Sequence, residues 1–291
     1  MTVRKAVILA AGFGTRFLPL TKSVPKEMVP LIDRPVIQYI VEEAVAAGLT
    51  EIVIVTALGK AVIEDYFDKD EHLETLLSKK EDHARLAEIK RLHEMADIVF
   101  VRQKGRAGNG HAVLAARSVI GDGPFAIFFP DDVILHDTPA IGQLLSVFER
   151  TGSTVLAVQE VPREEVVNYG VIEPEAVEPR LHRVRRIIEK PTMEEAPSNL
   201  TTVGRFVVTP RLLDTLRDTP VGRAGEIWLM DAFDRLAHEE PVFAYEYEGE
   251  RFDCGQPLGA LKASLRLAAG RPDLRPAVLD YARSLAAKEV P

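Results

Sequence analysis

Short apolar runs alternate with amphipathic stretches along the first half of the chain. Apolar runs of this length that are bounded by polar residues and glycine predict buried strands, and the stretches between them predict helices. The predicted strands span residues 5–10, 51–56, 97–102 and 125–130, and the predicted helices span residues 35–47, 61–66, 71–94, 109–118 and 138–150. Regular alternation of strand and helix is typical of an α/β protein with a parallel sheet flanked by helices.

The second half of the chain has a more mixed pattern. Further strands are predicted near residues 154–160, 170–173, 183–190, 201–208 and 242–247. We expect them to extend the sheet and to close over a ligand. No internal repeat, heptad array or flexible linker is evident, so the sequence predicts a single domain over residues 1–291 that ends in a C-terminal helix at residues 271–291.

The loop after the first predicted strand carries the clearest chemical signal. It belongs to the segment LAAGFGTRFLPLTKSVPKEMVP at residues 9–30. Gly12 and Gly14 let the backbone approach a ligand closely, and free N–H groups in such a loop form an anion site. Arg16 adds a planar fork that fits phosphate oxygens, and Lys26 adds a compact positive charge. The pattern indicates a site for a nucleoside triphosphate.

Two other nucleotide-binding motifs do not fit this segment. The dinucleotide motif G-x-G-x-x-G needs a third glycine where the chain has Phe17, and the strand at residues 51–56 has no terminal acid for a ribose. The ATPase and GTPase phosphate loop, G-x-x-x-x-G-K-[ST], is absent from the sequence. A nicotinamide oxidoreductase is therefore improbable.

Composition limits the class of protein. The chain of 291 residues is 46% hydrophobic and 27% charged, and its net charge is -8. An acidic body argues against nucleic-acid binding, so the cations near the loop are expected to form a local site. The single cysteine, Cys254, fits a reducing compartment. The apolar run at the N-terminus is too short for a secretory or membrane segment, and we expect a cytoplasmic enzyme with no membrane partner.

Two aspartates follow the apolar run FAIFF. Asp131 and Asp132 stand at the carboxyl end of a predicted strand, where ligands bind in open α/β sheets. A carboxylate there suits Mg2+ that bridges phosphates, although an Asp pair after a strand is also common in turns. Because neighbouring residues of an extended segment point to opposite sides, we expect only one of the two to face a metal.

A glycine-rich loop at residues 101–113, VRQKGRAGNGHAV, offers contacts for a base. Gln103 has both a donor and an acceptor, which suits the edge of a pyrimidine, and Gly108 would let the backbone supply a second contact. His111 could be catalytic, but we favour a hydrogen bond at the helix terminus for it.

The string G-x-G-T-R-x-L-P-x-T-K-x-x-P-K-E-M at residues 12–28 resembles the sugar-1-phosphate nucleotidyltransferases, and within them the bacterial UTP:glucose-1-phosphate uridylyltransferases. Later parts of the chain match the same family order, with Y-G-V, E-K-P, S-N-L-x-x-V-G-R and D-C-G at residues 169–171, 189–191, 198–205 and 253–255. The resemblance covers roughly residues 3–268. It implies a Rossmann-like three-layer fold with a mixed, mainly parallel sheet, in which residues 1–150 mainly bind the nucleotide and residues 151–270 mainly bind the sugar phosphate and contribute to oligomerisation.

The resemblance also implies an activity. UMP would pass from UTP to glucose 1-phosphate by a Mg2+-dependent in-line displacement, giving UDP-glucose and pyrophosphate, in a homodimer or homotetramer. The proposed catalytic residues are Arg16, Lys26, Asp131 and Lys190, and the proposed metal ligands are Asp131 and Asp253. The nucleotide-binding set is Ala11, Gly12, Gly14, Thr15, Arg16, Lys26, Glu27, Gln103 and Gly108, and the sugar-phosphate-binding set is Asp132, Gly170, Glu189, Lys190 and Val203.

The chain departs from the family pattern at three informative positions. Asn109 replaces a leucine in G-L-G-H-A, and Trp228 and Met230 replace the two polar residues of E-I-Q-L-T-D-A. These changes leave the choice of nucleotide and sugar open, and dTTP, CTP or a different hexose phosphate are alternatives. Trp228 and Met230 could equally pack against the core or a subunit. A catalytically weak regulatory homologue is a further alternative, although the proposed catalytic residues are all present.

Overall fold

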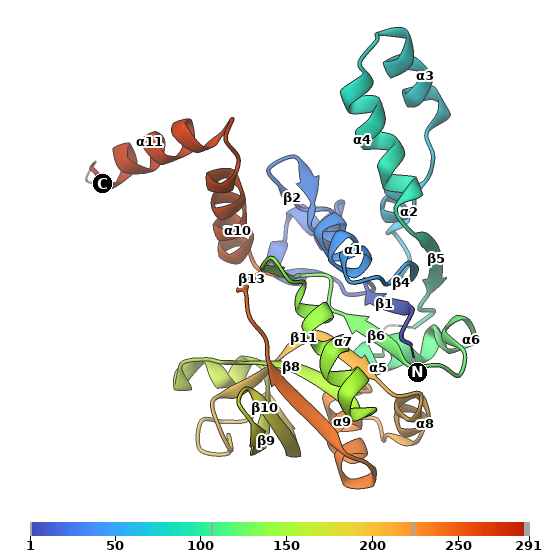
Figure 1. Cartoon of the computed structure of the whole chain (residues 1–291), viewed down its shortest axis with the longest axis vertical. Helices are drawn as coiled ribbons and strands as arrows, with labels where there is room; N and C mark the ends of the chain where they lie inside the picture. The colour runs from blue at the N-terminus through green and yellow to red at the C-terminus, as the bar shows by residue number, and fades with distance from the viewer. Residues whose placement is uncertain (1, 106, 223–224, 288–291) are drawn as a thin grey trace.

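The central feature of the computed structural model, which describes residues 2–105, 107–222 and 225–287, is a large twisted sheet (Figure 1). Within these residues, nine strands form this sheet in the order β5-β4-β1-β6-β11-β8-β12-β10-β9. The strands are β1 (Lys5–Leu9), β4 (Glu51–Thr56), β5 (Asp97–Arg102), β6 (Phe125–Phe128), β8 (Thr154–Glu160), β9 (Gly170–Glu178), β10 (Leu181–Glu189), β11 (Leu200–Val208) and β12 (Val242–Glu246).

The sheet is mixed, and its two halves pair differently. β5, β4, β1 and β6 are parallel neighbours, as the alternating pattern of the first half predicts. β11 runs antiparallel to both β6 and β8, and β10 runs antiparallel to β12 and β9. The parallel pairing of β8 and β12 is the exception in the second half. Parallel pairing therefore dominates only in the half that carries the glycine loop.

Helices cover both faces of the sheet. The helices in the described residues, not all of which pack on the sheet, are α1 (Val36–Ala46), α2 (Ala61–Phe67), α3 (Glu71–Lys79), α4 (His83–Glu94), α5 (Asn109–Ala115), α6 (Arg117–Ile120), α7 (Ala140–Thr151), α8 (Arg211–Asp218), α9 (Leu229–Glu239), α10 (Pro257–Gly270) and α11 (Arg275–Ala286). None of the helices in the part of the chain that the structure describes is long and apolar enough to span a bilayer.

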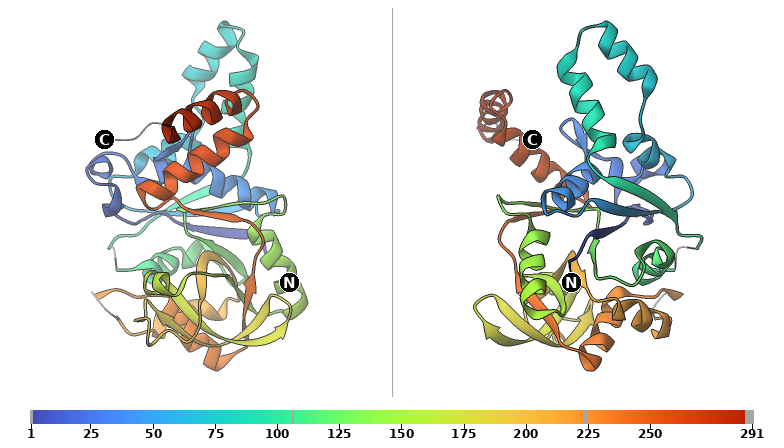
Figure 2. Two further views of the ribbon diagram at one scale, coloured as in Figure 1. Left: turned by 90° about the vertical axis from the view of Figure 1, so that its left-hand side faces the viewer. Right: turned by 45° about the vertical axis from the view of Figure 1, so that its right-hand side comes forward.

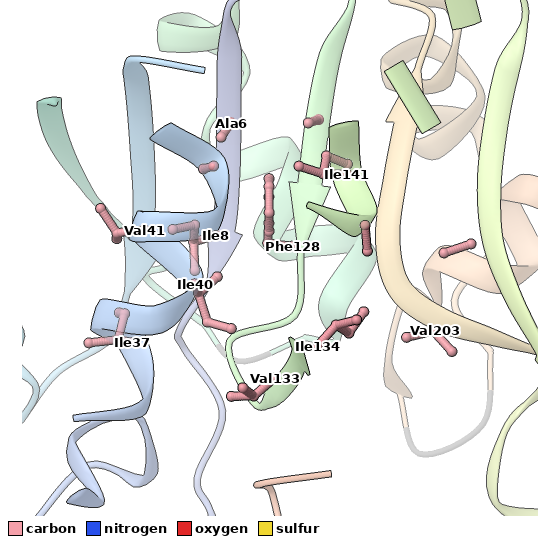
Figure 3. Packing of buried hydrophobic residues seen from close by; sticks show 14 of the residues in the cluster. Ala6, Ile8, Ile37, Ile40, Val41, Phe128, Val133, Ile134, Ile141 and Val203 are labelled. Carbon is pink, nitrogen blue, oxygen red and sulfur yellow. The ribbon is translucent and has the colours of Figure 1, made fainter. Parts of the chain in front are cut away.

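Strand residues alternate between two hydrophobic clusters. Ile8 on β1 packs with Ile37 and Ile40 of α1 and with Ile141 of α7, as Figure 3 shows. The neighbouring Val7 points to the other face, where α5, α8 and α9 contribute the second cluster. Because successive side chains of a strand point to opposite faces, a strand that is apolar throughout requires helices on both sides. The result is the three-layer α/β arrangement expected from the sequence.

The prediction of one helix over residues 71–94 is wrong. The segment forms two helices, α3 and α4, which contact each other as a hairpin that projects beyond the sheet (Figure 2). Glu81 takes a left-handed conformation with φ 55°, which ends the first helix. Asp82 then accepts a hydrogen bond from Arg85 N at 3.2 Å and caps the second. A continuous charged, amphipathic pattern does not reveal such a break.

A small two-stranded ribbon, also not predicted as such, contains Asp253 and begins directly after Asp131, so it lies beside both metal candidates. β7 (Asp132–Leu135) runs antiparallel to β13 (Glu250–Asp253), with Asp132 opposite Asp253. Shorter pieces complete the fold: β2 (Pro30–Leu31), β3 (Arg34–Pro35), and the 3-10 turns η1 (Thr15–Phe17), η2 (Leu20–Lys22), η3 (Lys26–Met28) and η4 (Arg163–Asn168).

The described part of the chain finishes in two helices that lie to one side. α10 follows β13, and α11 extends away from the body of the molecule (Figure 1). α11 lies within the segment at residues 271–291 that was predicted to be helical. None of its described side chains is buried.

Candidate active site

Two adjoining pockets open beyond the carboxyl ends of β1 and β6. One has a volume of about 400 Å³ and is lined in part by the glycine loop. The other has a volume of about 540 Å³ and is lined mainly by residues of the second half. We call them the nucleotide pocket and the sugar pocket. The residues that line both are Asn109, Phe129, Asp131 and Trp228. Ligands in the two pockets would therefore meet beside Asp131.

The glycine loop forms one wall of the nucleotide pocket. Ala11, Gly12, Gly14 and Thr15 all line it, as does Lys26. Gly14 has φ 69°, and a Cβ there would lie 3.0 Å from Cβ of Lys26. The left-handed backbone and the tight contact both favour glycine at this position. The sequence thus shapes a loop that brings backbone N–H groups and the Lys26 side chain to one cavity.

Lys26 and Asp131 form the closest ion pair of this region. The Nζ atom of Lys26 lies 2.5 Å from Oδ2 of Asp131, and both side chains are mostly buried. Burial opposes the charge on each group, but the pairing outweighs it: the pKa of Lys26 is raised and the pKa of Asp131 is lowered. Both groups are therefore charged at neutral pH.

Arg16 lies at the junction from the other side. Its guanidinium is 3.4 Å from Oδ2 of Asp253 and 4.0 Å from Oδ2 of Asp131, and its side chain is 58% exposed. Arg16 lines the sugar pocket. The other predicted nucleotide-binding residues, except Glu27, line the nucleotide pocket. An exposed, always charged fork beside these two carboxylates can also reach an incoming phosphate.

Asp131 and Asp253 lie on two sides of Gly255. A Cβ at Gly255 would clash with Oδ2 of Asp131 and would come within 2.9 Å of Oδ1 of Asp253. The two carboxylates therefore converge on one small space, and burial together with the neighbouring Asp132 and Asp131 raises the pKa of Asp253. No group of three or more His, Cys, Asp or Glu suited to a metal occurs in the described part of the chain. Two carboxylates completed by phosphate oxygens and waters fit Mg2+.

Gln103 and Gly108 lie together on the wall of the nucleotide pocket. Nε2 of Gln103 donates to the carbonyl oxygen of Gly108 at 3.1 Å and contacts Nδ1 of His111 at 2.9 Å. These contacts orient the amide, so its carbonyl oxygen is the atom left for a ligand. His111 lies in the first turn of α5, and its hydrogen-bond partner is the Gln103 side chain, not a group of the helix terminus as favoured from the sequence.

The glycine-rich loop is joined to the start of α9 by backbone pairing. Gly110 N donates to Ile227 O at 2.9 Å, and Ile227 N donates to Ala107 O at 2.8 Å. A Cβ at Gly108 would lie 2.5 Å from Ile227 O. Asn109 adds a third link, because its Oδ1 accepts a hydrogen bond from Leu229 N at 2.8 Å. Asn109, which replaces the leucine of the family pattern, therefore caps the start of α9 and also lines both pockets.

The sugar pocket contains Gly170, Glu189 and Lys190. A Cβ at Gly170 would lie 2.9 Å from Oγ1 of Thr202 and 3.0 Å from Met230, so only glycine fits without a shift. Burial raises the pKa of Glu189, while the adjacent Lys190 ammonium, 3.8 Å away, lowers it in part. A desolvated carboxylate beside a cation is suited to bind hydroxyl groups.

Two residues expected in the site do not line either pocket. Glu27, predicted to bind the nucleotide, is 1% exposed, and its carboxylate holds Nζ of Lys60 at 2.7 Å. Val203, predicted to contact the sugar phosphate, is buried in the hydrophobic core, as the labelled side chain in Figure 3 shows. Motif matching could not separate these residues from their ligand-facing neighbours, because adjacent residues of a strand or turn point in different directions.

Asp132 lines the sugar pocket, but protein groups engage both of its oxygens. Oδ2 accepts a hydrogen bond from Gly204 N at 3.0 Å, and Oδ1 is 2.6 Å from a guanidinium nitrogen of Arg251. Asp131 alone of the pair thus faces the junction, as the extended geometry predicts. Arg251, which was not predicted as a site residue, also lines the sugar pocket and lies over the ring of Tyr169 at 5.1 Å.

A buried arginine supports the same turn from behind. Arg205 on β11 is fully buried and pairs with Glu43 of α1 at 2.7 Å. It also donates to the carbonyl oxygen of Asp132 at 2.5 Å and to that of Phe129 at 3.3 Å. The sequence signal for it was present in the V-G-R motif, but only the fold shows that its role is to fix the turn that presents Asp131.

Comparison with known proteins matches this sequence to the nucleotidyl transferase family over most of its length. The family model described as nucleotidyl transferase matches residues 5–269. The chain is 46% identical to the UTP–glucose-1-phosphate uridylyltransferase of Bacillus subtilis (strain 168), covering 99% of this chain and 98% of the relative. It is 44% identical to UTP–glucose-1-phosphate uridylyltransferase 1 of Staphylococcus saprophyticus, covering 98% of this chain and 99% of the relative.

Solved structures agree with the sequence relatives. A UDP-glucose pyrophosphorylase complexed with UDP-glucose is 39% identical with a TM-score of 0.85, covering 93% of this chain and 100% of that one. A UTP-bound UGPase from Acinetobacter baumannii is 38% identical with a TM-score of 0.89, covering 99% of this chain and 100% of that one. The chain therefore belongs to the nucleotidyl transferase family, as the motifs at residues 12–28 and 253–255 indicated.

Proposed function

We propose that this protein transfers UMP from UTP to glucose 1-phosphate, releasing pyrophosphate and forming UDP-glucose. The observation that carries the proposal is the position of Asp131 on the shared wall of two pockets, beside Lys26 and Arg16. A nucleotide and a sugar phosphate would bring their phosphates together at that point. The names of relatives that cover nearly the whole chain support the choice of UTP and glucose 1-phosphate.

The nucleotide pocket accounts for the binding of UTP. The loop at Gly12 and Gly14 would hold the triphosphate through backbone N–H groups. The carbonyl oxygen of Gln103 would accept the N3–H of uracil, and the backbone at Gly108 would contact the base edge. Cytosine has no hydrogen at N3, so this arrangement favours uracil over cytosine.

The sugar pocket accounts for the binding of the second substrate. Glu189 would accept hydrogen bonds from two neighbouring hydroxyls, and the backbone at Gly170 would approach another. Lys190 would neutralise the attacking phosphate. Asp132, held by Arg251, would shape the wall.

The reaction follows as a direct displacement. A phosphate oxygen of glucose 1-phosphate, already anionic, attacks the α-phosphorus of UTP, and the bond to the β-phosphate oxygen breaks as pyrophosphate leaves. Lys26 stabilises the charge on the α-phosphate and Arg16 stabilises the leaving pyrophosphate. No general base is needed, so catalysis depends on positioning and charge neutralisation.

Asp131 and Asp253 would hold Mg2+, whose contribution when bound is to neutralise phosphate charge. Asp131 is paired with Lys26 in the structure, so with UTP bound Lys26 would turn to the α-phosphate and release the carboxylate.

We also propose a homodimer or homotetramer that works in the cytoplasm. Leu258, Leu261 and Leu265 follow one face of α10 and are 60%, 57% and 48% exposed, and Tyr281 on α11 is 66% exposed. Surfaces of this kind commonly bury against a second copy. Light scattering on the wild type and on Leu261→Glu tests this, because a monomeric wild type would refute it. The cytoplasmic location rests on the single cysteine, Cys254.

The function is tested by product analysis with purified protein, Mg2+ and glucose 1-phosphate, comparing UTP, dTTP and CTP. UDP-glucose formed fastest with UTP supports the proposal. Faster turnover of dTTP or CTP would keep the chemistry and change the nucleotide, and binding without turnover would favour a regulatory homologue.

A further inference from the structure

The only tryptophan of the chain stands between the two pockets. Trp228 lines both of them and directly precedes α9. Trp228 replaces a polar residue of the family pattern E-I-Q-L-T-D-A, and the sequence alone did not show what its large ring does there.

Lys190 reaches the face of this ring from the sugar pocket. Its Nζ atom lies 4.9 Å from the centroid of the Trp228 ring. A cation over an indole face is attracted by the negative potential of the ring, and indole provides the strongest such platform among protein side chains. Apart from this ring, the Glu189 carboxylate lies 3.8 Å from the Lys190 ammonium. The Lys190 side chain is 49% exposed, and a long side chain in that environment has many alternative rotamers.

The backbones on both sides of the contact are fixed. Lys190 has φ 48°, an uncommon conformation for a residue with a side chain, and its N–H donates to Tyr169 O at 3.0 Å. On the other side, Trp228 O accepts from Ala232 N at 3.3 Å. The next residue, Leu229, donates its N–H to Oδ1 of Asn109 at 2.8 Å. Two fixed backbones leave the ring and the ammonium as the parts that adjust to each other.

We propose that Trp228 is a positioning residue for Lys190. Its ring face holds the Lys190 ammonium at the boundary of the two pockets, so that the phosphate of an incoming sugar phosphate meets a cation already in place. Asn109 supports this arrangement because it anchors the backbone directly after Trp228. The inference rests on the proposed role of Lys190 in the uridylyl transfer.

The first test compares Trp228→Leu with Trp228→Phe in steady-state assays of pyrophosphate release. Leucine removes the ring, and the KM for glucose 1-phosphate should rise about three- to tenfold, while the KM for UTP changes less than twofold. Phenylalanine keeps an aromatic face and should restore most of the loss. A Phe variant as impaired as the Leu variant, or an equal rise in both KM values, would overturn the inference.

Tyr245→Leu provides the matched control. It removes a comparable contact, in which the Arg180 guanidinium lies 5.6 Å from the Tyr245 ring, and Tyr245 is on the wall of neither described pocket. Both KM values should be unchanged in this variant. A rise like that of Trp228→Leu would mean that loss of any such contact disturbs the fold, which would remove the support for a specific role.

A double-mutant cycle separates this inference from the role of Lys190 itself. Lys190→Met should raise the KM for glucose 1-phosphate, and adding Trp228→Leu to it should cause no further rise. If Trp228→Leu acts by the same factor in both backgrounds, the ring works independently of Lys190 and the inference fails. If Lys190→Met alone has no effect, the proposed role of Lys190 fails instead. The free Lys190→Met protein should also differ from wild type in tryptophan emission, and identical spectra would refute the contact.

Discussion

Lys60 reaches from the start of α2 into the protein interior and holds both carboxylate oxygens of Glu27, at 2.8 and 2.7 Å. Its Nζ atom also donates to the carbonyl oxygen of Ala10 at 2.6 Å. Glu27 is adjacent to Lys26, and Ala10 immediately precedes the glycine loop. One buried ammonium therefore ties the two segments that bind phosphate in the proposed mechanism.

Breaking this buried pair should destabilise the protein strongly. Glu27→Gln keeps the shape of the side chain but leaves the Lys60 ammonium without its counter-charge, which costs on the order of 3–5 kcal/mol in comparable pairs. Urea unfolding should show this loss. The double variant Glu27→Gln with Lys60→Met should lose less than the sum of the two single variants, because it leaves no unpaired charge. Strictly additive losses would contradict the account.

Lys26→Ala should reduce kcat by about 10²- to 10³-fold, because it removes a preorganised cation from the transition state. Lys22→Ala is the matched control, since Lys22 is exposed in the same motif and lies on neither described pocket. Steady-state kinetics of both variants should show a large loss for the first and less than a twofold change for the second. Equal kinetics for wild type and Lys26→Ala would remove Lys26 from the mechanism.

Glu189 should make sugar binding pH-dependent. Burial raises the pKa of Glu189 above its ordinary 4.5, so protonation removes the charged acceptor at a higher pH than usual. The KM for glucose 1-phosphate should rise as pH falls through that raised pKa. In Glu189→Gln the KM should be about tenfold higher at neutral pH, and its remaining pH dependence should be that of the substrate phosphate alone. An identical pH profile in the two proteins would refute this role.

The same pKa shift has a consequence for stability. Because the pKa of Glu189 is raised in the folded state, folding favours the neutral carboxyl. The contribution of Glu189 to folding stability is therefore present at low pH and is lost as pH rises through the raised pKa. Glu189→Gln, which is neutral at every pH, should therefore be at least as stable as wild type at pH 7. Thermal unfolding across pH measures this, and a variant clearly less stable at pH 7 would indicate that the charged form is the stabilising one.

Asp253→Asn should weaken the use of Mg2+. Losing one of two carboxylates should raise the Mg2+ concentration for half-maximal rate by at least about tenfold, because loss of an outer-shell partner of a metal ligand alone typically lowers metal affinity by about 10- to 100-fold. Glu250→Gln is the control, because Glu250 lies on the same strand but pairs with Arg266 at the surface. Turnover that persists in excess chelator would show that the reaction needs no divalent metal.

The sequence predicted the parts of the fold and the site that depend on local pattern. The apolar runs at residues 51–56 and 97–102 became β4 and β5 with the expected bounds. β4 is almost fully buried, as an unbroken apolar run predicts, whereas β5 forms the edge of the sheet and none of its residues is fully buried. The glycine loop likewise lines a pocket where the motif placed it. These features are encoded within a few neighbouring residues.

What the sequence missed depends on contacts between distant segments. Glu27 pairs with Lys60, and Arg205 supports the turn that carries Asp131. From the sequence alone, each of these charged side chains could equally have been exposed to solvent. The same is true of Glu81, where the chain reverses between α3 and α4. Trp228 and Asn109 are departures in separate motifs, yet the Asn109 side chain accepts a hydrogen bond from Leu229, the residue that follows Trp228 and begins α9. Only the fold shows that they share one location.

Isotope exchange tests the central claim that UTP and a sugar phosphate react directly beside Asp131. Labelled pyrophosphate is incubated with the protein, Mg2+ and unlabelled UTP, with and without glucose 1-phosphate, and label in UTP is measured. Direct displacement predicts exchange only when glucose 1-phosphate is present, and none with Asp131→Ala. Label that enters UTP without the sugar phosphate would reveal a covalent uridylyl-enzyme, and no exchange under either condition would contradict the proposed activity.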